Sequence, residues 1–173
     1  MTTLTAIAVA APRRLPSHPS RLLVAGLLVG PLFTAGYLTQ GAFRGNGYSQ
    51  LRHPVSSLAL GPQGWEQIAN FGVCGLLVML FSISLRRTLR TGPGALAVPL
   101  LVAVWGIGLI GAGIFVTDPV GGYPTAASHV TWHGQMHDLA FSLPAFVART
   151  LAMLTAAVAF ARVERAGSRC VRR

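Results

Sequence analysis

The sequence predicts an all-α membrane protein, a helix bundle with four transmembrane spans and both termini in the cytoplasm. Four long apolar runs lie at about residues 22–43, 68–85, 95–116 and 139–161. A run of about 18 or more apolar residues is long enough to cross the hydrocarbon core as a helix. Only 10% of the residues are charged, and most of them lie between the runs. A chain of 173 residues is long enough for one small helix bundle and little else.

The arginines predict the orientation, because cytoplasmic segments of membrane proteins carry an excess of positive charge. All 14 basic residues are arginines. The first and last segments and the second loop hold most of them: Arg13, Arg14, Arg21, Arg86, Arg87, Arg90, Arg162, Arg165, Arg169, Arg172 and Arg173. The first loop has only Arg44 and Arg52, and the third has none. We therefore expect a multi-pass protein of the cell membrane, with loops one and three outside.

The segments between and around the spans complete the domain organisation. Residues 1–20 contain prolines and serines and are expected to form a disordered cytoplasmic tail. The transmembrane domain takes residues 21–163, and a basic cytoplasmic tail follows at 164–173. The net charge of +10 does not indicate a nucleic-acid partner, because no basic stripe is interleaved with exposed aromatic residues. Membrane lipids are the expected partners.

Small residues in the first and third spans predict close contacts between helices. The first span has Gly26 and Gly30 in a GxxxG spacing, and the third has four glycines, Gly106, Gly108, Gly111 and Gly113. Small side chains let helix backbones approach in a medium where hydrophobicity drives no association. Residues 106–111 also match GxGxxG, but a dinucleotide site needs a preceding strand. Inside a membrane span the motif indicates helix packing.

The fourth span is expected to continue a helix that runs from Ser128 to Glu164 and is kinked at Pro144. Arg149 lies about ten residues into this span, where an arginine costs about 2.5–3.5 kcal/mol on insertion scales. It could bind an anion or a lipid headgroup in a wet cavity. It could equally snorkel to the interface, or pair with Glu66 or a backbone carbonyl.

Polar residues collect in the two outer loops, and three histidines there follow a helical spacing. His129, His133 and His137 are spaced i, i+4, i+8 and would line one stripe of a helix. Neighbours at i and i+4 can share a metal ion. A site with one metal would use His133 and His137, with Asp118 and His53 as further candidates. The alternatives are a hydrogen-bonded cluster, in which Arg52 pairs with an acid, and unrelated surface residues.

Several short segments come in an order that resembles the DUF998 family of bacterial and archaeal integral membrane proteins. The positions that carry this resemblance are Tyr48, Ser56, Ser57, Leu58, Phe115, Asp118, His133, Gly134 and His137. The resemblance covers about residues 22–162 and implies a membrane fold with no established activity. Family members often look like six-span proteins, whereas this chain stops after four. A second copy, in a homodimer, could complete the bundle.

Two functions remain open at this stage, and the sequence does not decide whether the protein is an enzyme. The first is non-enzymatic binding of a ligand, lipid headgroup or partner by the outer His/Asp/Arg cluster. Its candidate binding residues are Arg52, Tyr48, Asp138 and Arg149. A transporter ranks last, because the span interiors carry no charged group besides Arg149.

The second function is a zinc-dependent membrane hydrolase that acts on a lipid amide or ester. It rests on an analogy with the alkaline ceramidase and adiponectin-receptor group, whose histidine-held zinc activates water. By that analogy zinc would be the cofactor and His133, His137 and His53 its ligands. Asp118 would orient the water or act as base, and Ser56 or Ser57 would line the site.

Overall fold

The structure is a computed structural model that describes residues 21–171 except Asn46, Pro93 and residues 126–128. The tail expected at residues 1–20 lies outside the described residues. The described chain forms the α-helices α1 (Arg21–Phe43), α2 (Gly64–Thr88), α3 (Ala97–Ile114), α4 (Trp132–Gln135) and α5 (Leu143–Val171). A 3-10 helix, η1 (Val55–Ala59), precedes α2, and a π-helix, η2 (Met136–Ser142), joins α4 to α5. The all-α prediction is confirmed.

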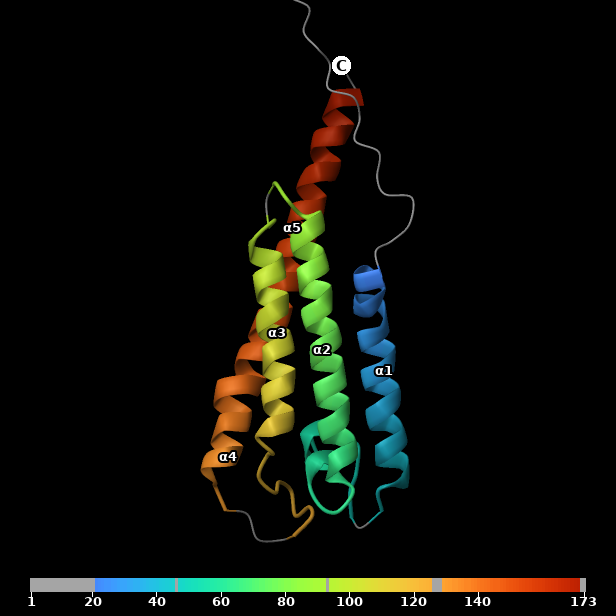
Figure 1. The fold of residues 1–173 in the computed structure, drawn as a ribbon, viewed down its shortest axis with the longest axis vertical. Coiled ribbons are helices and arrows are strands. Elements are labelled where there is room, and N and C mark those ends of the chain that lie inside the picture. Colours follow the sequence, from blue (N-terminus) through green and yellow to red (C-terminus); the bar gives the residue numbers. More distant parts are fainter. Residues whose placement is uncertain (1–20, 46, 93, 126–128, 172–173) are drawn as a thin grey trace, which may run out of the picture.

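Four helical segments of the described chain are long and apolar enough to cross a membrane. They are Leu23–Phe43, Gly64–Thr88, Ala97–Ile114 and Trp132–Arg162, and the last combines α4, η2 and most of α5. The start of α1 and the end of α5 lie at the same end of the bundle (Figure 1). The described residues of the segments 44–63 and 115–131 lie at the other end, which we call the loop end.

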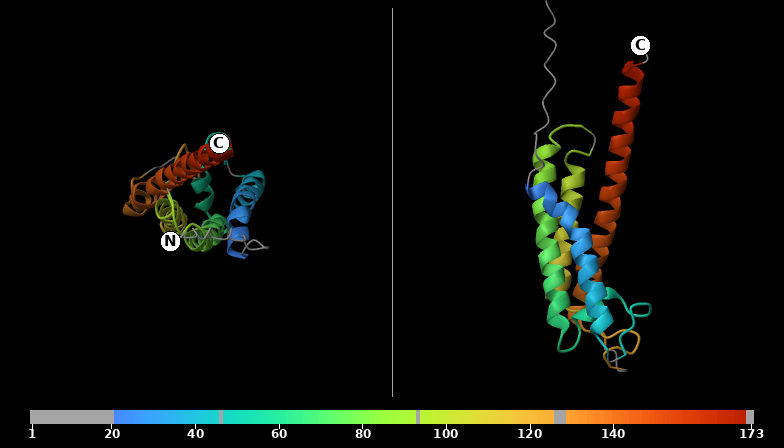
Figure 2. Two further views of the ribbon diagram at one scale, coloured as in Figure 1. Left: turned by 90° about the horizontal axis from the view of Figure 1, so that it is seen from above. Right: turned by 90° about the vertical axis from the view of Figure 1, so that its right-hand side faces the viewer.

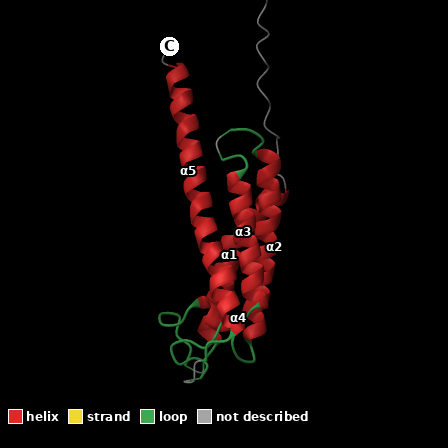
Figure 3. Ribbon diagram, turned by 90° about the vertical axis from the view of Figure 1, so that its left-hand side faces the viewer, coloured by secondary structure: helices red, strands yellow, loops and turns green. Residues whose placement is uncertain are grey.

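The helices pack in the order α1, α2, α3, α5, so that α2 and α3 form the centre. Helix α2 contacts α1 on one side and α3 on the other, and α3 also contacts η2 and α5. The core between them is formed by Val29, Cys74, Val78, Val98, Val102 and Ala152. Towards its C-terminal end α5 leans away from the other helices and extends past them (Figures 2 and 3).

Glycines bring α3 close to its neighbours, as the sequence predicts. A Cβ atom on Gly75 of α2 would lie 2.9 Å from the carbonyl oxygen of Gly106 in α3. A Cβ atom on Gly108 would lie 2.7 Å from the carbonyl oxygen of Phe141 in η2. Backbone atoms cannot move aside as a flexible side chain can, so both crossings require glycine. In the first span Gly26 lies against Phe81 of α2, whereas Gly30 faces open space. Only the first glycine of the GxxxG spacing therefore lies at a helix contact.

The last span begins at Trp132 and changes its winding in front of Pro144. The backbone N–H of Leu143 donates to the carbonyl of Asp138, five residues earlier. Proline has no N–H, so the carbonyl four residues before Pro144 has no α-helical donor, and π-type bonding accommodates such a break. The irregularity expected at Pro144 is therefore this π turn.

Candidate functional site

His53 lies buried between two tyrosines and joins the first loop to the third. Its Nδ1 accepts a hydrogen bond of 2.9 Å from the backbone N–H of Ser49, and its Nε2 lies 3.2 Å from the carbonyl oxygen of Gly121. A carbonyl oxygen only accepts, so Nε2 carries the proton. The ring centroids of Tyr48 and Tyr123 lie 5.6 and 5.5 Å from that of the imidazole. Both nitrogens of His53 are thus used within the protein.

Tyr48 is a half-buried packing partner in this group. Its ring meets that of Tyr123 edge-on, with 5.4 Å between the centroids. Burial raises the pKa of the Tyr48 phenol, and Tyr123 raises it further, against a lowering influence of Arg44. The phenol therefore stays protonated at neutral pH and offers no anionic group to a ligand.

Asp118 fastens the third loop to the start of α4. Its Oδ1 accepts a hydrogen bond of 2.6 Å from the hydroxyl of Thr131, and its Oδ2 accepts one of 2.9 Å from the backbone N–H of the same residue. Thr131 in turn caps α4 by accepting from the N–H of Gly134. The two hydrogen bonds from Thr131, helped by His133, lower the pKa of Asp118. A side chain at position 134 would overlap the carboxylate.

His137 fastens the end of α3 to η2. It is fully buried, and its Nδ1 lies 2.7 Å from the carbonyl oxygen of Phe115 and 3.0 Å from that of Ala112. Carbonyl groups in the last turn of a helix lack partners within the helix. The other side of the imidazole packs edge-on against Phe71 of α2. His137 therefore acts as a cap that ties three elements together.

The remaining predicted site residues take no part in the hydrogen bonds described above for the side chains of His53, Asp118 and His137. Ser56 is half-buried in η1, while His129, Arg52 and Asp138 are exposed. Arg149 is also exposed, and its guanidinium carbon lies 5.5 Å from the ring centroid of Phe146 on the same helix. It forms no ion pair with Glu66 or any other described residue. Among the described residues no hydrogen bond or ion pair joins Arg52, Tyr48, Asp138 or Arg149 to another of the four, and a binding site shared by them stays a prediction.

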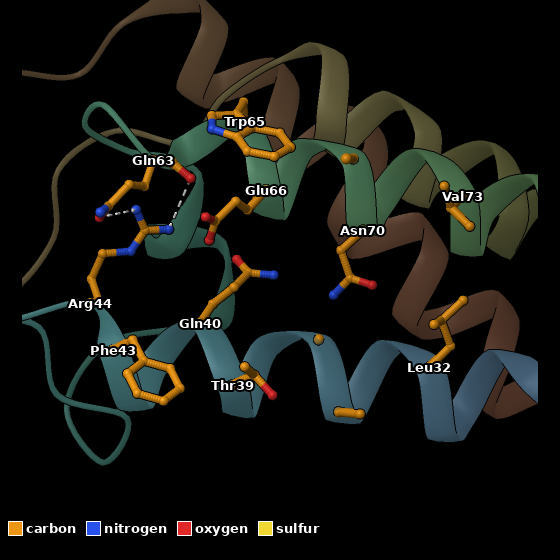
Figure 4. A pocket seen from close by; sticks show the side chains of 13 residues that line it. Leu32, Thr39, Gln40, Phe43, Arg44, Gln63, Trp65, Glu66, Asn70 and Val73 are labelled. Carbon is orange, nitrogen blue, oxygen red and sulfur yellow. Dashed lines mark hydrogen bonds between the residues drawn. The ribbon is translucent and has the colours of Figure 1, made fainter.

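A groove between the loop-end halves of α1 and α2 was missed by the sequence analysis. Its volume is about 710 Å³, and Figure 4 shows the side chains that line it. Exposed apolar residues from both helices form the part of the groove farther from the loop end: Leu32, Ala35, Ala69 and Val73. Polar groups gather towards the loop end: Thr39, Gln40, Arg44, Gln63, Glu66 and Asn70. The groove is thus apolar along the helices and polar where they end.

Arg44 is the buried cation of this groove, with only 6% of its surface exposed. Its guanidinium donates to the backbone carbonyls of Leu58 (2.5 Å) and Gln63 (3.3 Å), and to the side-chain Oε1 of Gln63 (3.4 Å). Its Nε–H is buried and has no partner. Within the described part of the chain no carboxylate pairs with it. The available sequence signal was Gln40 and Arg44, spaced i, i+4 at the end of an apolar run.

A model of the family of proteins of unknown function DUF998 matches residues 27–173. The chain belongs to the DUF998 family. The match covers all of the loop-end residues described above and confirms the resemblance seen in the sequence. No curated protein and no solved structure matches the chain significantly.

Most of the residues that carry the resemblance to DUF998 hold the loop end together. Asp118 and Gly134 form the junction between the third loop and α4. The carbonyl oxygen of Phe115 accepts a hydrogen bond from Nδ1 of His137. Ser57 and Leu58 are fully buried within η1. These positions therefore have structural roles, in the contact of the third loop with α4, in the contact of α3 with η2, and in the short helix η1.

The three histidines predicted to bind zinc are not brought together. Among the described residues, no group of three or more His, Cys, Asp or Glu side chains could hold a metal ion. His53 uses both ring nitrogens in the link between the loops, and His137 points its Nδ1 at carbonyls of α3. His133 is exposed, and its ring lies tilted against that of the neighbouring Trp132. Hydrogen bonds to the backbone thus engage His53 and His137, two of the three histidines that the metal hypothesis needs.

Proposed function

We propose that this DUF998 protein binds a membrane phospholipid by its headgroup in the groove between α1 and α2. The observation that carries the proposal is Arg44, a buried guanidinium with a free Nε–H and no carboxylate partner among the described residues. A buried charge is costly unless it is paired. Phosphate oxygens are strong acceptors that match the planar guanidinium.

The position of the groove supports a lipid over a soluble anion. Arg44 directly follows the 23 residues of α1, so it lies where a transmembrane helix reaches the headgroup region. Phe43 and Trp65 beside it are 84% and 66% exposed, as expected for aromatic residues at a membrane interface. Leu32 and Val73 offer an apolar surface to an acyl chain. We further propose, from the arginine distribution, that the loop end faces outward and the lipid belongs to the outer leaflet.

The proposal is tested by native mass spectrometry of the detergent-purified protein titrated with a defined phospholipid. Arg44→Gln removes the charge and is expected to weaken lipid binding by about tenfold or more, because hydrogen bonds to charged groups contribute about 1.5–3 kcal/mol. Arg52→Gln is the matched control, because Arg52 is an exposed arginine of the same loop outside the groove. Equal binding by Arg44→Gln and wild type would overturn the proposal.

A second pair of variants separates lipid binding from loop folding, since Arg44 also holds two backbone carbonyls. Ala69→Trp fills the groove from α2 without removing any polar group. Ala157→Trp places the same side chain on an exposed position of α5 outside the groove. The first should lose lipid and the second should retain it. Retention by both would show that lipid binds elsewhere.

A further inference from the structure

The groove that we propose for a phospholipid also holds acceptor groups that no described residue satisfies. Glu66 lies in the first turn of α2, and Figure 4 shows its carboxylate pointing towards α1. No described residue donates a hydrogen bond to this carboxylate or forms an ion pair with it. Gln40 of α1 lies on the facing side of the groove, and its Oε1 is buried without a partner. Two acceptors thus face the same space.

We infer that the lipid bound in this groove carries a primary ammonium group beside its phosphate, as phosphatidylethanolamine does. This inference rests on the proposed function. A primary ammonium has three N–H donors, so it can bond to the Glu66 carboxylate and the Gln40 Oε1 together. Arg44, which lines the groove and has no carboxylate partner among the described residues, supplies the positive charge for the phosphate.

The two charges of the groove are held apart, and this separation indicates a dipolar ligand. Glu66 and Arg44 both line the groove but form no ion pair with each other. Arg44 is instead drawn towards the first loop by the carbonyls of Leu58 and Gln63. In an ethanolamine headgroup a short ethylene bridge separates phosphate from ammonium, so one ligand can meet both charges.

The same groups predict which headgroups are rejected. A choline headgroup has no N–H donor, so it leaves the buried Oε1 of Gln40 unsatisfied. A glycerol headgroup brings no positive charge to Glu66. Soluble glycerophosphoethanolamine has the right charges but lacks the acyl chains that Leu32 and Val73 would contact. We therefore assign the site to the lipid.

The test is a native mass spectrometry titration of the full chain with phosphatidylethanolamine, phosphatidylcholine and phosphatidylglycerol of identical acyl chains. Wild type is expected to bind phosphatidylethanolamine at least about fivefold more tightly than the other two. Glu66→Gln should abolish this preference and leave phosphatidylglycerol binding unchanged or stronger. Asp138→Asn is the control, because Asp138 is an exposed carboxylate outside the groove. Gln40→Leu gives a second route, with phosphatidylethanolamine binding lowered towards that of phosphatidylcholine.

The outcomes separate the inference from the proposed function. Equal binding of the three lipids, unchanged in Glu66→Gln, would overturn the ethanolamine assignment while phospholipid binding stands. Absence of binding by any lipid would overturn the proposed function and the inference with it. Displacement of the bound lipid by glycerophosphoethanolamine at comparable concentration would overturn the assignment to a lipid.

Discussion

The Nδ1 atom of His137 lies 2.7 Å from the carbonyl oxygen of Phe115, across the junction between α3 and the helix that follows it. The same nitrogen lies 3.0 Å from the carbonyl oxygen of Ala112. Since carbonyls only accept, the proton is on Nδ1. A residue that looked like a metal ligand in the sequence therefore serves as the C-terminal cap of a transmembrane helix.

His137→Leu is expected to destabilise the protein by about 1–3 kcal/mol, because it removes the donor that faces the carbonyl oxygens of Ala112 and Phe115. The measurement is thermal unfolding of the detergent-purified protein. His133→Leu serves as control, since His133 is exposed and a surface change there should stay within about 0.5 kcal/mol. Equal losses in the two variants would contradict the capping role.

The junction at Asp118 is expected to weaken in acid. Its hydrogen bonds with Thr131 depress the pKa in the folded state below the ordinary value of 3.8. The stabilisation is therefore present at neutral pH, and it is lost as the pH falls below 3.8 through the lower folded-state pKa. Thermal unfolding measured between about pH 6 and pH 3 should show a smaller pH dependence in Asp118→Asn than in wild type. The same dependence in both proteins would exclude this junction as the acid-sensitive contact.

The crossing of α3 and η2 is expected to be intolerant of any side chain at Gly108. Gly108→Ala places a Cβ atom 2.7 Å from the carbonyl oxygen of Phe141, and such overpacking costs about 1–3 kcal/mol. Gly72→Ala, in the middle of α2, is the matched control, because no atom of another element lies within 4 Å of a Cβ atom there. Alanine is the better helix former, so the control should be neutral or slightly stabilising. The free energies of unfolding decide between these outcomes.

Elemental analysis of the purified protein tests the zinc hypothesis directly. Because His53, His133 and His137 are engaged in separate contacts, zinc should be well below one equivalent per chain. The double variant His133→Ala/His137→Ala should have the same content as wild type. About one zinc per chain in wild type, lost in the double variant, would restore the hydrolase hypothesis.

The sequence predicts the spans well, because apolar runs of this length determine the fold in a bilayer. Helix α2 shows the limit of that argument. The helix begins at Gly64, whereas the apolar run begins near residue 68. The run misses the first turn because that turn is polar and carries Glu66 and Gln67. The contact between Gly108 and Phe141 also follows from the rule that small residues mark helix interfaces.

The site was harder to predict, because its residues meet only through tertiary structure. The His53 ring meets Gly121 from 68 positions away along the chain, which no local spacing shows. The regular spacing of His133 and His137 suggested a shared ion. In the structure His133 is exposed, whereas His137 is buried against α3. The His137 ring bonds to a backbone carbonyl at the end of that helix, a role that the spacing of the histidines does not indicate. The groove depends on the separation of α1 and α2, and the sequence carries no signal for that distance.

Arg44 joins two equilibria that would otherwise be independent. Its guanidinium bonds to the carbonyls of Leu58 and Gln63 in the first loop, and the same side chain lines the groove. A ligand that binds the guanidinium alters its hydrogen bonds to the first loop. By the same linkage, a change in the conformation of the loop alters the affinity for the ligand. Under the proposed function, the lipid composition of the membrane would be sensed at the water-exposed surface as a change in loop order.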